Sequence, residues 1–150
     1  MKNFFIKEEF SFFVLLYTFI KKDTILTLIY IVMKISHIEH LGIAVKSIEE
    51  ALPYYENVLG LKCYKIELLE PTSPESTIAK FIEKNNGNGG MHHLAFAVED
   101  GVAGALAEVE EKGIRLIDKA PRKGAEGLNI AFLHPKSTLG VLTELCEKPE

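Results

Sequence analysis

The chain has 150 residues, the size of one domain, and its 47% hydrophobic and 25% charged residues are sufficient for an ordinary core. The net charge is −4 and the sequence has no basic block, which excludes a typical nucleic-acid-binding surface. Cys63 and Cys146 have neither C-x-x-C nor zinc-knuckle spacing. We therefore expect a reduced, cytoplasmic protein in which each cysteine is a small buried apolar residue.

Residues 1–33 form an apolar extension that differs in composition from the rest of the chain. Two apolar runs, 12–20 and 24–32, are separated by the charged segment Lys21-Lys22-Asp23. These charges interrupt the roughly 20 apolar residues that a membrane-spanning helix needs, and no signal-peptide cleavage pattern follows. Three interpretations stay open: a helix or hairpin packed on the domain, an extension outside a functional protein that starts at Met33, and a membrane anchor, which the charges disfavour.

Module one, over residues 36–70, is predicted to be a strand, a helix and a second strand. The first strand covers about 36–45. Ser47 and Glu50 form a capping box that begins a helix over 48–59, in which Pro53 predicts a late start or a kink. Gly60 ends this helix, and residues 61–69 are predicted to form a strand.

A linker over residues 71–90 joins module one to module two, which covers 91–147. Ser76 is the expected N-cap of a short linker helix over 77–84, and the glycine-rich loop 85–90 lacks the strand-loop-helix context of a phosphate site. Module two is predicted to contain one helix after its first strand and three further strands. The expected ranges are a strand ending at 98, a helix over 102–112, and strands near 114–118, 129–133 and 141–146, with turns over 121–127 and 134–140.

An internal repeat relates the two modules. His40-Leu41-Gly42-Ile43-Ala44-Val45 matches His93-Leu94-Ala95-Phe96-Ala97-Val98 at four of six positions, always 53 residues apart. The same offset relates 59–62 to 112–115, and a constant offset across strand, helix and turn indicates a duplicated unit. We therefore predict an α+β fold of two paired modules.

The first copy is shorter than the second. The segment from Gly113 to Glu144 is 31 residues long, but its counterpart from Gly60 to Glu67 is only 7, and the difference of 24 is about enough for two strands and their turns. Module one therefore lacks about two strands. Either an exposed sheet edge favours association with a second copy, or other chain, such as the apolar run 24–32, fills the gap.

Four polar residues occupy matched positions in the repeat: His40 and His93 on the first strands, and Glu67 and Glu144 on the last ones. Two imidazoles and two carboxylates form a mixed nitrogen and oxygen set that suits a divalent metal such as cobalt, nickel, manganese or zinc. Any one of these residues alone would be an ordinary core or surface residue. Their matched placement favours a metal site.

The remaining histidines are weaker candidates. Because side chains alternate along a strand, His92 is expected on the face opposite His93, at the surface or supporting the site from beside it. His37 is expected at the surface. His134-Pro135-Lys136-Ser137 is either a ligand-contacting loop or a plain turn.

Several segments together resemble the vicinal oxygen chelate superfamily and, within it, the methylmalonyl-CoA epimerases. The resemblance covers about residues 34–147. The segments that carry it are 40–45, Ile66-Glu67-Leu68-Leu69-Glu70-Pro71-Thr72-Ser73-Pro74, His92-His93-Leu94-Ala95-Phe96, 131–137 and Thr143-Glu144-Leu145.

The resemblance implies a fold of two βαβββ modules that form a cupped mixed sheet around one metal ion. The implied metal ligands are His40, Glu67, His93 and Glu144, with glutamine in place of Glu67 in some members. The implied ion is cobalt, with manganese, nickel or zinc as alternatives, and no other cofactor is expected. The implied partners are an acyl-CoA substrate and a second copy in a homodimer. The composition argues against nucleic acid as a partner, and the charges at 21–23 disfavour a membrane.

The implied reaction interconverts (2R)- and (2S)-methylmalonyl-CoA by removing the α-proton and passing through a metal-stabilised enolate. Glu144 is the expected catalytic acid–base group, and a second one is expected on a middle strand of module one, in the region that this chain lacks. Two alternatives remain: a glyoxalase-type lyase acting on a glutathione hemithioacetal, and a catalytically inactive derivative that binds metal or ligand.

Overall fold

The computed structural model describes residues 19–21, 24–26, 33–61 and 65–147, and the chain divides into two compact units, Met1–Val32 and Met33–Glu150. In the first unit, the strands β1 (Phe19–Lys21) and β2 (Thr24–Leu26) pair antiparallel. The described part of the extension is therefore a short hairpin. None of the helices in the described ranges is long and apolar enough to cross a membrane.

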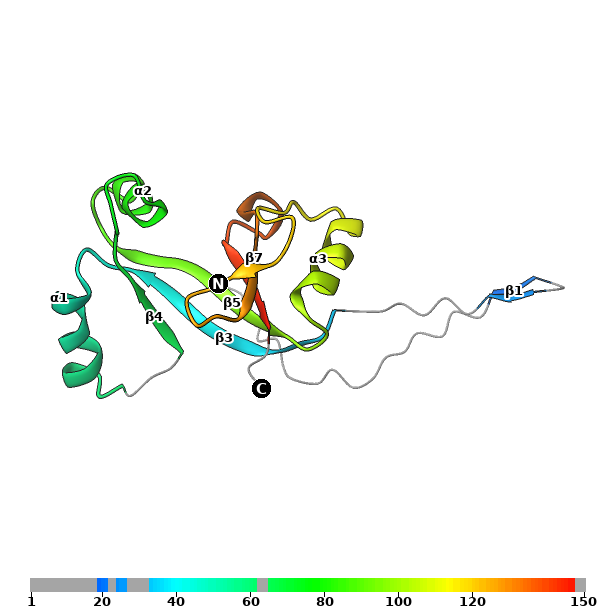
Figure 1. Cartoon of the computed structure of the whole chain (residues 1–150), viewed down its shortest axis with the longest axis horizontal. Coiled ribbons are helices and arrows are strands. Elements are labelled where there is room, and N and C mark those ends of the chain that lie inside the picture. Colours follow the sequence, from blue (N-terminus) through cyan, green and yellow to red (C-terminus); the bar gives the residue numbers. More distant parts are fainter. Residues whose placement is uncertain (1–18, 22–23, 27–32, 62–64, 148–150) are drawn as a thin grey trace, which may run out of the picture. The chain divides into compact units, whose positions relative to one another are not determined.

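The second unit is built on one mixed sheet of six strands (Figure 1). In chain order the strands are β3 (Ile35–Ala44), β4 (Ile66–Leu69), β5 (Gly90–Val98), β6 (Arg122–Lys123), β7 (Asn129–Leu133) and β8 (Thr143–Glu147). Their spatial order is β4-β3-β5-β8-β7-β6. β3 and β5 pair antiparallel at the centre, and each pairs in parallel with the last strand of its own module, β4 or β8. The predicted α+β fold with a mixed sheet is confirmed.

The three α-helices begin where the sequence predicts them: α1 (Ile48–Pro53), which continues as the π-helical turn η1 (Tyr54–Val58), α2 (Thr77–Lys84) and α3 (Val102–Glu111). A short 3₁₀ turn, η2 (Pro135–Ser137), lies within the segment predicted as a turn. The Ser47 hydroxyl accepts a hydrogen bond from the Glu50 amide, and the Ser76 hydroxyl accepts one from the Ala79 amide. The predicted irregularity at Pro53 is a change of helix type, because proline has no amide to donate to the preceding turn.

Two strand predictions need correction. Residues 114–118 form only an isolated bridge between Leu116 and Leu133, and the strand of this region is β6, inside the segment predicted as a turn. The reason is local: the Asp118 carboxylate, in place of a strand carbonyl, accepts the hydrogen bond of the Phe132 amide at 2.9 Å. The strand predicted over 61–69 is described only from Ile66 to Leu69, and residues 62–64 lie outside the described ranges.

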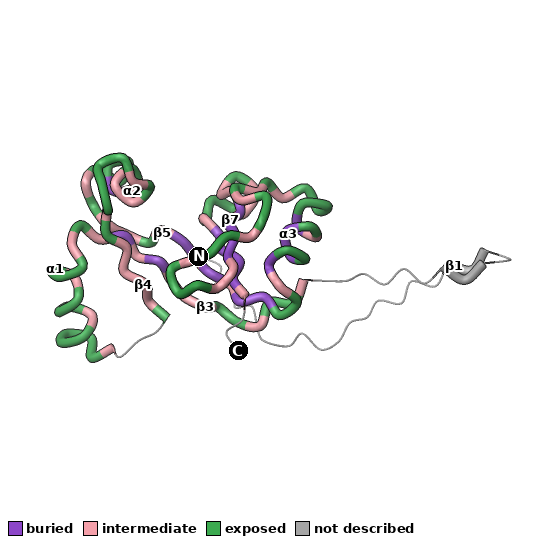
Figure 2. The backbone as a smooth tube through the Cα atoms, viewed as in Figure 1, coloured by how far each residue is buried: buried purple, intermediate pink, exposed green. Residues whose placement is uncertain are grey.

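The hydrophobic core lies almost entirely in module two (Figure 2). Its buried residues come from β5, α3, β7 and β8: Val98, Val102, Ala105, Leu106, Val109, Ala131, Leu133 and Leu145. In contrast, α1 buries no residue, and among the described residues 33–89 the buried hydrophobic ones are Ala44 and Ile82. Module one has two strands in the sheet, β3 and β4, and no described counterpart of β6 and β7. Its helix therefore lacks the sheet surface that α3 covers.

Candidate metal centre

The central strand pair places the two repeated histidines on one face of the sheet. Across the β3–β5 pairing, His40 lies opposite Ala95 and His93 lies opposite Gly42. Each bulky ring thus faces a small residue, which leaves room for both rings over the centre of the sheet. At Gly42 the space is fully used, because an added Cβ would lie 2.1 Å from Cε1 of His93.

The last strands of the two modules bring the two carboxylates to the same place. Glu67 on β4 pairs with Gly42, and Glu144 on β8 pairs with Ala95. These two pairings are equivalent in the repeat, so each glutamate flanks the central strand of its own module. The structure therefore brings together all four residues that the repeat singled out.

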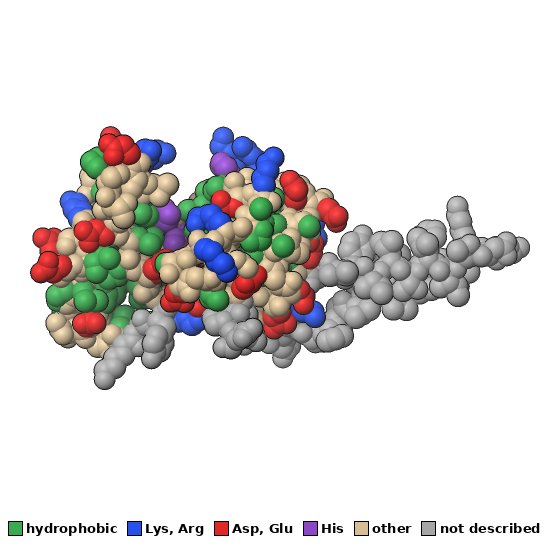
Figure 3. Space-filling view, viewed as in Figure 1, with side chains coloured by type: hydrophobic (Ala, Val, Ile, Leu, Met, Phe, Trp, Pro, Cys, Tyr) green, Lys and Arg blue, Asp and Glu red, His purple; other side chains and the backbone are tan. Residues whose placement is uncertain are grey.

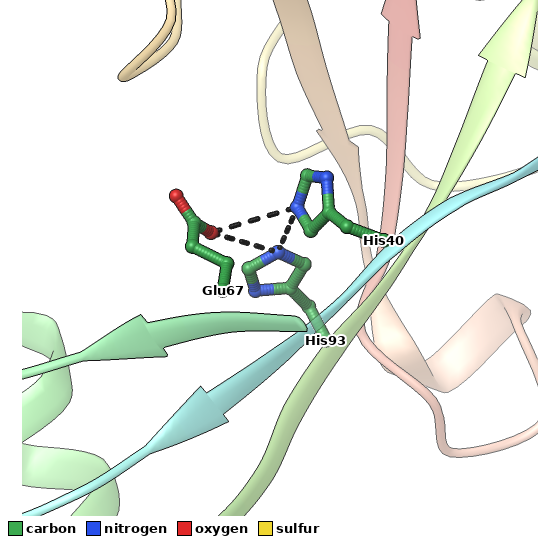
Figure 4. Close-up of side chains that lie close together, drawn as sticks. All are labelled: His40, Glu67 and His93. Atoms are coloured by element: carbon green, nitrogen blue, oxygen red, sulfur yellow. Dashed lines mark hydrogen bonds and ion pairs between the residues drawn. The ribbon is translucent and has the colours of Figure 1, made fainter. Parts of the chain in front are cut away.

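The four side chains converge on one point. The Nε2 atoms of His40 and His93 are 2.9 Å apart. Oε2 of Glu67 lies 3.5 Å from Nε2 of His40 and 3.6 Å from Nε2 of His93. Figure 4 shows the Glu67 carboxylate directed at both rings. Oε2 of Glu144 lies 3.2 Å from Nε2 of His93 and 3.9 Å from Nε2 of His40. One oxygen of each carboxylate is therefore directed at the two imidazoles.

Two irregularities in the β3–β5 pairing lie directly before the two histidines. The pairing skips Glu39 on β3 and His92 on β5, so each is an extra, bulged residue. Because a bulge breaks the alternation of side chains, both Glu39 and His92 line the same cavity as the histidines that follow them. The prediction that His92 and His93 face opposite sides is therefore wrong, and His92 instead supports the site from beside its neighbour.

Burial shifts the pKa values of two members of the cluster in opposite directions. Burial lowers the pKa of His93 to about 4, helped by the nearby His40 and His92. Burial raises the pKa of Glu144 to about 7; His40 opposes this rise and the Glu67 carboxylate adds to it. Both shifts favour the uncharged side chains, because burial removes these groups from water. The pKa of Glu39 is lowered: its burial would raise the value, but the contacts with His40 and Lys65 outweigh this.

The donor set fits a divalent metal ion. Nε2 of both histidines and one carboxylate oxygen of Glu67 lie within 4.8 Å of one another. Two ligands at about 2.1 Å from one ion are about 3.0 Å apart at a right angle and about 3.4 Å apart at the tetrahedral angle. Most distances in the cluster lie near this range. His40 and His93 would hold such an ion through Nε2, and the adjacent carboxylates would balance its charge.

The cluster lies at the base of a cavity of about 430 Å³. In Figure 3, histidine side chains lie in a hollow of the surface that lysine and arginine side chains flank. Residues 122–126 and Leu128, around β6 and the following turn, form one wall, and Thr77 and Ile78 of α2 also line the cavity. The Arg122 guanidinium lies over the Phe132 ring, 5.3 Å from its centroid, and pairs with Asp118. Arg122 and Lys123 thus bring positive charge to the cavity wall.

The other two histidines that the sequence singled out, His134 and His37, do not line the cavity. His134 uses its Nδ1 atom to accept the hydrogen bond of the Lys136 amide, which makes it the cap of η2, and it does not line the cavity. His37 is exposed, as predicted. Cys146 is buried and unpaired, which confirms its predicted role, whereas Cys63 lies outside the described residues.

Sequence reasoning missed two residues at the centre. Gly42 was part of the repeat, but its contact with the His93 ring depends on the strand register. Glu39 precedes His40 as His92 precedes His93, so the offset of 53 could have indicated it. Because strict alternation places it on the opposite face, only the bulge reveals its contact with the site.

Comparison with known proteins agrees with this geometry. Residues 62–132 match the Glyoxalase/Bleomycin resistance protein/Dioxygenase superfamily. The mitochondrial methylmalonyl-CoA epimerase of Dictyostelium discoideum is 36% identical over 134 residues, which cover 76% of this chain and 80% of that protein. The ethylmalonyl-CoA/methylmalonyl-CoA epimerase of Cereibacter sphaeroides is 37% identical over 132 residues, covering 74% of this chain and 97% of that protein.

A solved structure of methylmalonyl-CoA epimerase in complex with methylmalonyl-CoA and NH4+ is 30% identical and has a TM-score of 0.71. The match covers 77% of this chain and 96% of the chain in that structure. The alignment with the Dictyostelium protein spans 134 positions but covers only 76% of this 150-residue chain, so some of the aligned positions of that relative have no counterpart in this chain. With these identities and this coverage, the chain belongs to the methylmalonyl-CoA epimerase family of the glyoxalase superfamily.

Proposed function

We propose that this protein is a metal-dependent epimerase that interconverts (2R)- and (2S)-methylmalonyl-CoA by abstracting the α-proton. The observation that carries the proposal is the convergence of His40, Glu67, His93 and Glu144 in a cavity of a chain related to named epimerases. Cobalt is the proposed ion, with manganese, nickel or zinc as alternatives. A cytoplasmic homodimer is the proposed form of the enzyme.

The site has the groups that this reaction needs. When bound, a divalent ion would act as a Lewis acid that lowers the energy of the enolate by several kcal/mol. Glu144 can accept the α-proton and return it, because its carboxylate lines the cavity and has one oxygen directed at the two histidines that would hold the ion. Arg122 and Lys123 line the cavity and suit the negative charges of an acyl-CoA carrying a free carboxylate.

Epimerisation also requires that the proton return to the opposite face of the α-carbon. In module two, β6 and the turn after it wall the cavity, and module one has no described counterpart of that segment. Glu67 is part of the ligand cluster, and Glu39 is engaged with His40 and Lys65. We therefore propose that proton return on the second face is the slow step. Exchange of the α-proton with solvent is expected to run faster than epimerisation.

The test measures both rates on the same sample. Purified protein with cobalt is incubated with (2R)- or (2S)-methylmalonyl-CoA in deuterated buffer, and NMR follows deuterium incorporation while chiral analysis follows epimer formation. Ethylmalonyl-CoA is tested in parallel, because the Cereibacter relative is named for both substrates. His93→Ala is expected to abolish exchange, whereas Glu110→Gln, an exposed change on α3, is expected to leave both rates unchanged.

Each other outcome identifies a different function. Cobalt binding without exchange would contradict the proposal and favour a derivative that only binds metal or ligand. Turnover of the hemithioacetal of methylglyoxal and glutathione, without exchange on either acyl-CoA, would favour a glyoxalase-type lyase. Epimerisation at the rate of exchange would contradict the slow second face, and would call for a second acid–base group in the cavity.

A further inference from the structure

Each of the two central histidines is preceded by a residue that bulges out of the β3–β5 pairing. Glu39 precedes His40 and His92 precedes His93, and the two bulged residues are themselves 53 positions apart. The internal repeat therefore places them at equivalent points of the fold. One carries a carboxylate and the other an imidazole, so they are equivalent in position and differ in chemistry.

Both bulged residues contact the same atom of the histidine that follows. The Oε2 atom of Glu39 is hydrogen-bonded to Nδ1 of His40, and Nδ1 of His92 lies 3.0 Å from Nδ1 of His93. The opposite ring nitrogens, Nε2, are the atoms that converge on Glu67 in Figure 4. Each ring is thus held through one nitrogen while the other is directed into the cluster.

A neutral imidazole carries a proton on one nitrogen and a lone pair on the other, and only the lone pair can bind a metal. The carboxylate of Glu39 can only accept a hydrogen bond, so it fixes the proton of His40 on Nδ1. His92 does the same for His93 when its own Nδ1 accepts. We propose that Glu39 and His92 are a matched pair of positioning residues that direct the Nε2 lone pairs of both histidines at the metal. This inference rests on the proposed function, because it requires His40 and His93 to be ligands.

The two positioning residues are themselves held in place. The second carboxylate oxygen of Glu39 lies 3.2 Å from Nζ of Lys65, which leaves Oε2 directed at His40. The His92 ring packs edge-on against Phe81 of α2, with centroids 5.1 Å apart. A charged partner makes an imidazole a stronger ligand than a neutral partner does, so Glu39 is expected to contribute more to metal affinity than His92.

The test uses the full chain loaded with zinc, which has no unpaired electrons and suits NMR. Histidine-selective ¹⁵N labelling is expected to show two slowly exchanging Nδ1–H resonances, assigned by loss of one each in His40→Ala and His93→Ala. Glu39→Ala should remove the His40 resonance alone and weaken zinc binding about 10- to 100-fold. His92→Phe, which keeps the ring beside Phe81, should remove the His93 resonance alone and weaken binding less than Glu39→Ala does.

Conservative and control variants separate positioning from packing. Glu39→Gln and His92→Gln keep a hydrogen-bond acceptor and should restore the lost resonance and most of the affinity. His37→Phe changes an exposed histidine of the same strand and should have no effect. Unchanged resonances and affinity in Glu39→Ala and His92→Phe would overturn the inference while leaving the proposed function intact. Absence of zinc and cobalt binding by the unchanged protein would instead refute the proposed function, and the inference with it.

Discussion

Replacing Gly42 with alanine would add one methyl group directly against the His93 ring. The added carbon would lie 2.1 Å from Cε1, 2.3 Å from Nδ1 and 2.7 Å from Nε2 of that ring. Gly42 does not have a positive φ, so alanine can adopt its backbone conformation. The effect of the substitution is therefore steric and acts on the proposed metal ligand itself.

The size of the displacement follows from these distances. Ordinary contact begins at 3.4 Å, so Cε1 must retreat from 2.1 Å by about 1.3 Å. The ring has little room to do so, because the rings of His40, His92 and Phe132 lie around it at centroid distances of 5.1, 5.3 and 5.4 Å. Overpacking of this kind costs about 1–3 kcal/mol. A misplacement of about 1 Å can cost about 100-fold in rate.

The assay combines α-proton exchange with cobalt and the unfolding free energy from urea titration. Gly42→Ala is expected to lower the exchange rate about 100-fold at a stability loss of about 1–3 kcal/mol. The matched control is Gly104→Ala in α3, where an added Cβ meets no atom within 4 Å. It should stabilise the protein by about 0.5–1 kcal/mol and leave the rate unchanged. Normal exchange and cobalt affinity in Gly42→Ala would refute the reasoning, because the His93 ring would then have moved without disturbing the site.

Three further predictions concern the pH dependence, the metal and the two halves of the core. In metal-free Glu144→Gln, the shifted group that remains is His93, whose pKa is lowered to about 4, so the free energy of unfolding should increase as the pH rises from 4 to 6.5. In metal-free His93→Gln, the shifted group that remains is Glu144, whose pKa is raised to about 7, so the free energy of unfolding should decrease as the pH rises from 4.5 to 7. Urea titrations across this range test both slopes, and slopes of equal sign would contradict the assignment. Cobalt at about 100 times its dissociation constant should stabilise the protein by about 2.7 kcal/mol. The measurement is the Tm, which should rise with cobalt and return to its original value when a chelator is added. A similar rise in Tm for His93→Ala would mean that the ion binds elsewhere. Leu106→Ala should lower the free energy of unfolding by about 2–5 kcal/mol and Leu52→Ala by under about 1 kcal/mol, because the two side chains are 3% and 39% exposed. Equal losses of stability would mean that α1 packs against a partner.

Local patterns were enough to predict most elements and the four residues of the cluster. Helix caps such as Ser47 and Ser76 act within one turn, so their hydrogen bonds follow from the sequence alone. The repeat with its offset of 53 predicted that His40 and His93 occupy equivalent strands, because a duplicated unit folds in the same way twice. The same offset indicated that module one is short, and the sheet has two strands, β3 and β4, in that module.

What the sequence left open depends on contacts between strands that are distant along the chain. The bulges at Glu39 and His92 are properties of the β3–β5 pairing, and alternation along one strand places both side chains on the wrong face. The strand predicted over 114–118 is replaced by a bridge, because the Asp118 carboxylate accepts the hydrogen bond of the Phe132 amide that a backbone carbonyl of this segment would otherwise accept. The apolar pattern of α1 was recognisable, yet its burial depends on counterparts of β6 and β7, and the described part of module one has none. Residue type and spacing therefore determined which groups form the site, whereas register, bulges and burial in the folded sheet decided how those groups are oriented and how strongly their pKa values shift.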